Sequence, residues 1–295
     1  AINMVNKTPR LIDESEVDIT LGSHKYRRVV GDFNIKTSDN AALRINAMQR
    51  DEGSGRSNPV TGTEPEIHRK GLAASLGMNL QTDNQFWLNY YRLQTHDNPD
   101  YGISFDATTR APGRILPASY YWGNERTFDQ SDTEITTLVN EYRLAPDSQI
   151  RTQLRLADYQ RSYWAKTPNL STAPDALGGV GGNQTRTSSY KTVTLQSDYN
   201  TKFAAFGMRH EVLAGIEYLK EESYRKGLQN FGTLAAPDFR PYQEAVAGSP
   251  TSFTSDSYAV YAQDTVEFIP QWKATLGVRR DQMDASYSSA TSPKL

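Results

Sequence analysis

The sequence predicts an all-β protein, an antiparallel meander of about eleven strands that forms the wall of a transmembrane β-barrel. The strongest observation is strict alternation of residue types, clearest where Trp272, Ala274, Leu276 and Val278 alternate with polar or small residues. Successive side chains of a strand point to opposite faces, so this segment has one apolar and one polar face. Repetition of the pattern along a chain is typical of a barrel with lipid outside and water inside.

The same alternation recurs along the whole chain, separated by turn-forming residues. The clearest further pair of faces is Ile150, Thr152, Leu154 and Leu156 against Arg151, Gln153 and Arg155. The expected strands centre on residues 17–21, 29–35, 43–47, 72–78, 86–90, 136–143, 150–156, 190–200, 212–218, 258–262 and 272–279.

The connections between these strands alternate in length. Turns near Ser38, Asp83, Asp147 and Pro270 are short, and the link near Phe203 is intermediate. Long loops start near residues 51, 97, 166 and 222. Bacterial outer-membrane barrels combine short periplasmic turns with long extracellular loops, whereas a soluble β-sandwich has no reason to keep its long loops at one end.

The composition limits the classes of function that the chain can have. The chain has 295 residues, no cysteine and a net charge of -2, so thiol chemistry is excluded and nothing indicates nucleic-acid binding. No run of about 18 apolar residues is present, which excludes a membrane-spanning helix. The mean hydropathy of -0.66 fits a soluble protein, but also a barrel in which only alternate strand residues are apolar. The 17 tyrosines fit aromatic girdles at the two membrane boundaries.

No catalytic constellation is evident. The four histidines, His24, His68, His96 and His210, lack metal-ligand spacing. The carboxylate neighbours 13–14 and 221–222 would point to opposite faces of a strand, and the glycine-rich stretch 178–182 lacks the Lys-Ser/Thr of a phosphate loop. Two alternatives to a transport barrel stay open, namely a soluble or secreted β-rich binding or adhesion module and an outer-membrane barrel enzyme.

Five short segments occur in the order found in one family. Residues 1–9 (AINMVNKTP) resemble the end of the plug domain of TonB-dependent siderophore receptors, and residues 26–34 (YRRVVGDFN) resemble the second barrel strand of those receptors. Residues 97–102 (DNPDYG) resemble a loop entry of the branch that takes up catecholate and hydroxamate siderophores. Residues 210–218 (HEVLAGIEY) and 261–265 (YAQDT), followed by the strand 272–279, are similar to later barrel strands.

The resemblance implies an outer-membrane receptor and energy-coupled importer of ferric siderophores, located in the bacterial outer membrane and not an enzyme. It implies a 22-stranded barrel of which this chain is the N-terminal half, with residues 1–10 as the tail of the plug and 11–295 as an incomplete barrel domain. Expected partners are the ferric siderophore, outer-membrane lipid and the inner-membrane TonB complex, which would bind through the missing N-terminal region. No cofactor is expected, because iron arrives already chelated.

The long stretch from Asp97 to Asp132 holds the candidate ligand contacts. It is rich in aromatic and arginine side chains, which suit anionic, partly aromatic ferric complexes because rings stack on such ligands and guanidinium groups donate hydrogen bonds. Packing of these aromatics within the loops, or their placement in a girdle, is an equally good interpretation. The candidate contacts are Tyr101, Arg110, Arg114, Tyr120, Tyr121 and Trp122.

Overall fold

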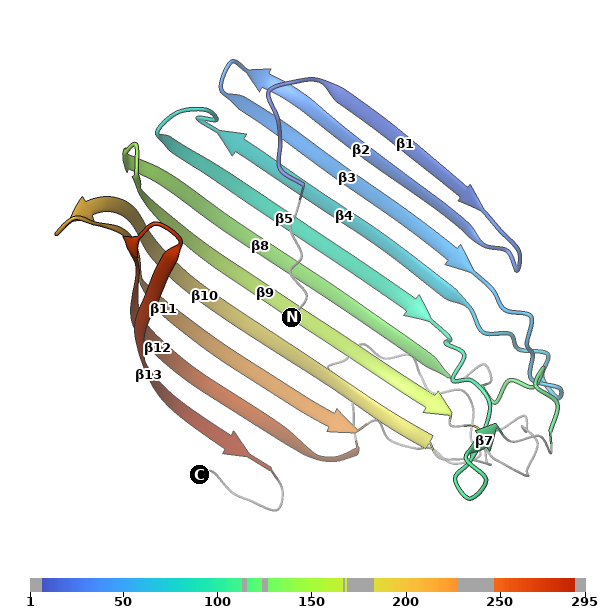
Figure 1. Ribbon diagram of the computed structural model, residues 1–295. Coiled ribbons are helices and arrows are strands. Elements are labelled where there is room, and N and C mark those ends of the chain that lie inside the picture. Colours follow the sequence, from blue (N-terminus) through green and yellow to red (C-terminus); the bar gives the residue numbers. More distant parts are fainter. Residues whose placement is uncertain are drawn as a thin grey trace.

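The chain folds as one curved antiparallel sheet of eleven strands in a computed structural model (Figure 1). The structure describes residues 7–112, 116–123, 127–166, 168, 183–227 and 247–289. The strands of this sheet pair in chain order, so the predicted meander is confirmed. They are β1 (Glu14–Leu21), β2 (Arg27–Ser38), β3 (Ala41–Glu52), β4 (Ile67–Met78), β5 (Asn84–Asp97), β8 (Phe128–Ala145), β9 (Ser148–Lys166), β10 (Asn183–Ala205), β11 (Met208–Gly227), β12 (Ala247–Ile269) and β13 (Trp272–Ser288).

A small separate hairpin lies in the loop between β5 and β8. It consists of β6 (Phe105–Asp106) and β7 (Ala111–Pro112). No described residue lies in an α-helix, and accordingly no membrane-spanning helix is found in the described part of the chain.

The pairing register brings apolar residues from each of the eleven strands onto one face, which we call the outer face. One row of register partners is apolar across seven consecutive strands: Ile35, Leu43, Leu76, Leu88, Leu138, Leu154 and Leu195. Many outer-face side chains are exposed, and Leu276 and Val278 reach 82% and 72% exposure. The expected sharing of one face by Val17, Leu43, Leu76, Leu154, Leu156, Ile216, Leu276 and Val278 follows from this register.

The opposite face, which we call the inner face, is polar and more crowded. Its buried side chains are small or hydrogen-bonding, such as Asn34, Ala42, Ser75, Ala157 and Ser255. Arg151, Arg155, Glu217 and Arg279 lie on this face, as their strand positions predict. A sheet with large apolar residues exposed and small ones buried is inverted relative to a water-soluble protein, and lipid is the solvent that suits its outer face.

The apolar band runs obliquely across the sheet. The row that passes through Leu76 on β4 reaches Gln282 on β13, six positions beyond Leu276. Seven strand steps separate β4 from β13, so the band drifts by roughly one residue per strand. With a rise of about 3.3 Å per residue and a strand spacing of about 4.7 Å, this drift corresponds to a strand tilt of about 35°. Transmembrane barrels have this tilt.

Aromatic side chains mark both margins of the apolar band. Tyr218 and Tyr258 lie on the outer face toward the long loops, with ring centroids 5.0 Å apart. Phe203 stacks on His210 at 5.0 Å near the short turns, where Trp272 is 63% exposed. Amphipathic rings of this kind occupy the water–lipid boundaries of membrane barrels.

The expected asymmetry of the connections is observed, and the strands are longer than the sequence indicated. The link near Phe203, which we expected to be intermediate, is a two-residue turn at Phe206 and Gly207, both with positive φ. β8 begins at Phe128, so the long irregular stretch ends at Thr127, five residues before Asp132. The extra strand residues lie beyond the apolar band. Both faces are polar there, so the alternation fades although the backbone pairing continues.

Candidate ligand-binding site

Two long loops pack against each other beyond the strand ends. We call the described residues of 53–66 and 98–127 the loop block. The Arg56 guanidinium fastens it by an ion pair with Asp100 (Nη1–Oδ1 2.6 Å) and by hydrogen bonds to the carbonyl oxygens of Gly102 (2.8 Å) and Tyr120. Backbone bonds join Ser57 to Ser119 (3.1 Å) and to Tyr121 (3.0 Å). An arginine with several acceptors fixes a loop more firmly than an isolated ion pair does.

Asn58 and Tyr121 form the interior of the loop block. Asn58 is fully buried. Its side-chain oxygen accepts a hydrogen bond from the Val60 amide at 2.9 Å, and its side-chain nitrogen donates one to the Gly123 carbonyl at 2.9 Å. Tyr121 is 1% exposed, and its hydroxyl donates to the Asn98 side chain. Burial raises the pKa of Tyr121 to about 12. These buried hydrogen bonds hold the two loops of the block together.

The structure separates the six sequence-predicted contacts into groups. Tyr121 and Trp122 are buried in the loop block at 1% and 3% exposure. Tyr101 and Tyr120 are half-buried, and Arg110 is exposed on the β6–β7 hairpin with a positive φ. Arg114 lies outside the described residues. The structure therefore brings Tyr101, Tyr120, Tyr121 and Trp122 together in one unit, in which the first two retain accessible surface.

An arginine–tyrosine cluster lies where the inner face of β9 meets the loop block. We did not predict this cluster from the sequence. Arg161 donates to both oxygens of Asp129 on β8 (2.9 and 2.5 Å), and its guanidinium lies 4.9 Å from the ring centroid of Tyr163. The Arg161 side chain remains 56% exposed. A partly exposed guanidinium over an aromatic ring offers both charge and a stacking surface to an anionic ligand.

Tyr101 connects the loop block to this cluster. Its hydroxyl is buried and has no hydrogen-bond partner among the described residues. Burial, followed by the negative charge of Asp129, raises its pKa above the usual range. We call Tyr101, Asp129, Arg161 and Tyr163 the inner-wall cluster. Within this cluster the Arg161 guanidinium is the donor that an oxygen-rich ligand can reach, whereas the Tyr101 hydroxyl is buried.

Arginine–tyrosine pairs recur on the inner face beyond this cluster. Arg50 lies 5.4 Å from the Tyr26 ring, and Arg279 lies 5.2 Å from the Tyr261 ring. On β9, Arg155 donates to the Tyr159 hydroxyl at 2.6 Å. Continued alternation on β9 would have identified these positions, because Arg151, Arg155, Tyr159, Arg161 and Tyr163 are all odd-numbered and share one face.

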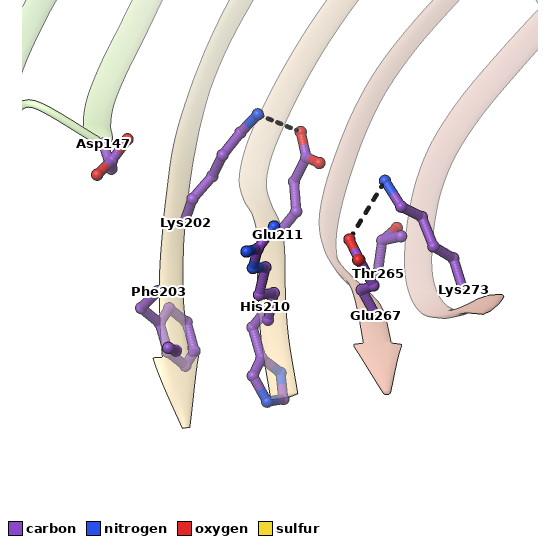
Figure 2. A pocket seen from close by; sticks show the side chains of 10 residues that line it. Asp147, Lys202, Phe203, His210, Glu211, Thr265, Glu267 and Lys273 are labelled. Atoms are coloured by element: carbon purple, nitrogen blue, oxygen red, sulfur yellow. Dashed lines mark ion pairs between the residues drawn. The ribbon is translucent and has the colours of Figure 1, made fainter. Parts of the chain in front are cut away.

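A hollow of about 410 Å³ lies on the inner face near the short turns (Figure 2). Lys202 pairs with Glu211 at 3.2 Å, and Lys273 approaches Glu267 at 4.0 Å. These four charged side chains pair with one another, and no tyrosine is among the described residues that line the hollow. No group of three metal-ligating side chains occurs among the residues that the structure describes.

Comparison with known proteins identifies the family. Residues 25–295 match the family described as "TonB dependent receptor-like, beta-barrel". The chain belongs to this family of outer-membrane receptors. The family consists of transporters, so the barrel-enzyme and soluble-module alternatives are excluded.

Individual relatives of this TonB-dependent receptor chain are distant. The catecholate siderophore receptor Fiu of Escherichia coli O157:H7 is 24% identical over 99% of this chain and 41% of its own length. The probable TonB-dependent siderophore receptor PiuA of Acinetobacter baumannii is 27% identical over 97% of this chain and 42% of its own length. This chain thus spans less than half the length of either relative.

Solved structures give the same fold. The siderophore receptor PiuA from Acinetobacter baumannii superposes with a TM-score of 0.80 at 23% identity, over 99% of this chain and 46% of PiuA. The ferric-catecholate import receptor Fiu from E. coli K12 in its closed form gives a TM-score of 0.79 at 23% identity, over 97% and 43% of the two chains. The eleven strands therefore match part of a TonB-dependent receptor barrel.

Proposed function

We propose that this chain is the N-terminal half of the barrel of a receptor that imports ferric siderophores across the outer membrane. Residues 1–10 form the tail of a plug, and residues 11–295 form the first eleven strands of the wall. The plug connects the receptor to the inner-membrane TonB complex, and the outer face contacts lipid. The names of Fiu and PiuA support this substrate class.

The inner-wall cluster is the observation that carries the proposal. It lies on the lumenal side of the wall, next to the long loops that face the outside of the cell in such barrels. Arg161 offers donors to an anionic ferric complex, Tyr163 offers a ring face, and the half-buried Tyr101 lies beside them. Tyr120 and Arg110 are accessible from the loop side, whereas Tyr121, Trp122 and Asn58 hold the loops in shape.

Ferric-siderophore binding to the full-length receptor in detergent tests this assignment. Aromatic and arginine contacts in a partly desolvated site contribute roughly 1–3 kcal/mol each, so Arg161→Ala with Tyr163→Ala should weaken binding by about ten- to a thousand-fold. The matched control is Arg151→Ala, an inner-face arginine of the same strand near the short turns, where it pairs with Glu141. Equal affinity of the two variants would remove the inner-wall cluster from the site. Failure of the wild type to bind any catecholate or hydroxamate complex would contradict the substrate class.

A further inference from the structure

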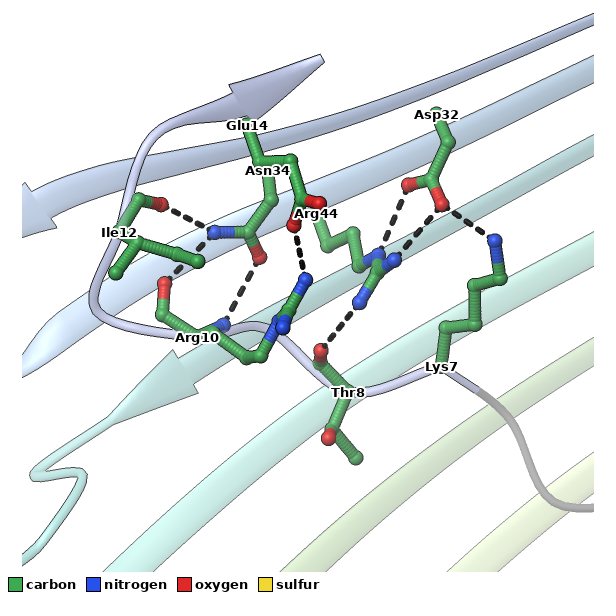
Figure 3. A network of polar contacts seen from close by, with 8 residues as sticks. All are labelled: Lys7, Thr8, Arg10, Ile12, Glu14, Asp32, Asn34 and Arg44. Carbon is green, nitrogen blue, oxygen red and sulfur yellow. Dashed lines mark hydrogen bonds and ion pairs between the residues drawn. The ribbon is translucent and has the colours of Figure 1, made fainter. Parts of the chain in front are cut away.

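The segment before β1 does not continue the outer edge of the sheet. Residues 7–12 instead cross the inner face of β2 and β3, and their contacts are shown in Figure 3. Three sets of contacts hold this segment, one made by Asn34, one by Asp32 and Arg44, and one by Pro9. We call them together the anchor.

Asn34 holds the segment through its backbone. Its side chain is 2% exposed and lies on the inner face of β2. The amide oxygen accepts the Arg10 amide at 2.9 Å, and the amide nitrogen donates to the carbonyl oxygens of Arg10 (2.7 Å) and Ile12. All three bonds go to the backbone. The Asn34 side chain therefore pairs with the backbone of residues 10–12 as a neighbouring strand would.

Asp32 and Arg44 form the charged part of the anchor. Arg44 donates to both oxygens of Asp32 (2.9 and 2.8 Å), and both side chains are about nine-tenths buried. Arg44 also donates to the Thr8 carbonyl at 3.1 Å. Lys7 reaches Asp32 at 2.6 Å, but its side chain is 59% exposed. The Asp32 and Arg44 side chains are thus buried under the segment, whereas the Lys7 side chain that reaches Asp32 is mostly exposed.

Pro9 adds an apolar wedge. It is buried over Gly77 of β4, and a Cβ atom at Gly77 would lie 3.0 Å from Cγ of Pro9 and 2.9 Å from Leu80. Gly71, on the same face of the same strand, has its nearest such neighbour at 3.6 Å. The absence of a side chain at Gly77 therefore makes the space that Pro9 fills.

We propose that the anchor is the fixed end of the mobile N-terminal domain. Movement of that domain stops at Lys7, and the contacts of the anchor stay intact while the domain moves. This rests on the proposed function in one respect, that a plug precedes Lys7. Tension arriving from upstream loads the Asn34, Arg44 and Pro9 contacts together, because all three act on residues 8–12. Without the anchor, the tension would pass directly to β1, which follows this segment in the chain.

Single-molecule pulling on the N-terminus of the full-length receptor in a lipid bilayer tests the anchor. The wild type should show a force peak when the extended chain reaches Lys7. Asn34→Ala and Gly77→Val should each shorten the lifetime of that peak at constant force by ten-fold or more. Lys7→Ala, which leaves Asp32 paired with Arg44, and Gly71→Ala should change the lifetime by less than two-fold.

Absence of a peak at this length in the wild type would overturn the proposal, and so would equal lifetimes for Gly77→Val and Gly71→Ala. The pulling result is independent of ligand. Failure of the proposed function would instead appear as loss of ferric-siderophore binding by the wild type, with the force peak intact.

Discussion

The hydroxyl of Tyr121 donates a hydrogen bond to the side-chain oxygen of Asn98, which also accepts from Thr127 at 2.6 Å. Asn98 directly follows β5, and Thr127 directly precedes β8. One buried phenol thus joins the two ends of the long loop, and it does so from inside the loop block. The position explains why a tyrosine predicted as a ligand contact is 1% exposed.

Tyr121→Phe should keep the loop block folded, because it deletes one hydrogen bond and Thr127 continues to satisfy Asn98. We expect a loss of about 1 kcal/mol in stability. Tyr121→Ala should cost about 3–5 kcal/mol through the cavity that it leaves. Limited proteolysis of the receptor in detergent should cut the loop of the alanine variant much faster than that of the phenylalanine variant. Equal cutting rates would contradict the packing role.

Asn58 offers a polar test of the same unit. Asn58→Asp keeps the acceptor for the Val60 amide but replaces the donor that bonds the Gly123 carbonyl with an oxygen that repels it. A buried, unpaired acceptor costs about 1–3 kcal/mol, and more when it is charged. The variant should therefore open the loop block at neutral pH and close it partly at pH values low enough to protonate the carboxyl. Proteolysis rates that do not depend on pH would count against this reading.

The two faces of the wall should respond oppositely to charge. Leu195 is 41% exposed on the outer face, and Gln196 is the next residue, on the inner face. Leu195→Lys should cost about 2–4 kcal/mol of folding free energy in a bilayer. Gln196→Lys should cost much less, because Asp198 lies within reach of its side chain. Urea titration of the full-length receptor in lipid vesicles measures both, and equal losses would contradict the assignment of faces.

The turn between β10 and β11 carries a removable strain. Phe206 has a φ of 53° and Gly207 a φ of 74°, a combination that two-residue hairpin turns adopt and that Asn-Gly suits best. A bulky residue is strained at positive φ. Phe206→Asn should therefore stabilise the hairpin by roughly 0.5–1 kcal/mol, measured as a shift in the urea midpoint in lipid vesicles. A lower midpoint would show that lipid contact of the exposed Phe206 ring outweighs backbone strain.

The sequence predicted the eleven strands and their order because lipid forces a period-two pattern on the outer face. It underestimated strand lengths, since β10 and β12 continue past the apolar band, where both faces are polar and the pattern carries no information. The site was harder to predict. Tyr121 and Tyr101 lie in one loop, and only their tertiary contacts separate a buried packing residue from a partly accessible one. Arg161 and Tyr163 were missed because the expected strand ended at Leu156.

Energy-dependent uptake tests the central claim most directly. Cells in which the full-length receptor is the sole route for ferric siderophores should accumulate labelled iron from at least one catecholate or hydroxamate complex. That uptake should be saturable, should be abolished by loss of the TonB complex, and should fall ten-fold or more with Arg161→Ala and Tyr163→Ala together, but not with Arg151→Ala. Uptake that persists without the TonB complex, or none for any complex despite normal receptor levels, would contradict the account.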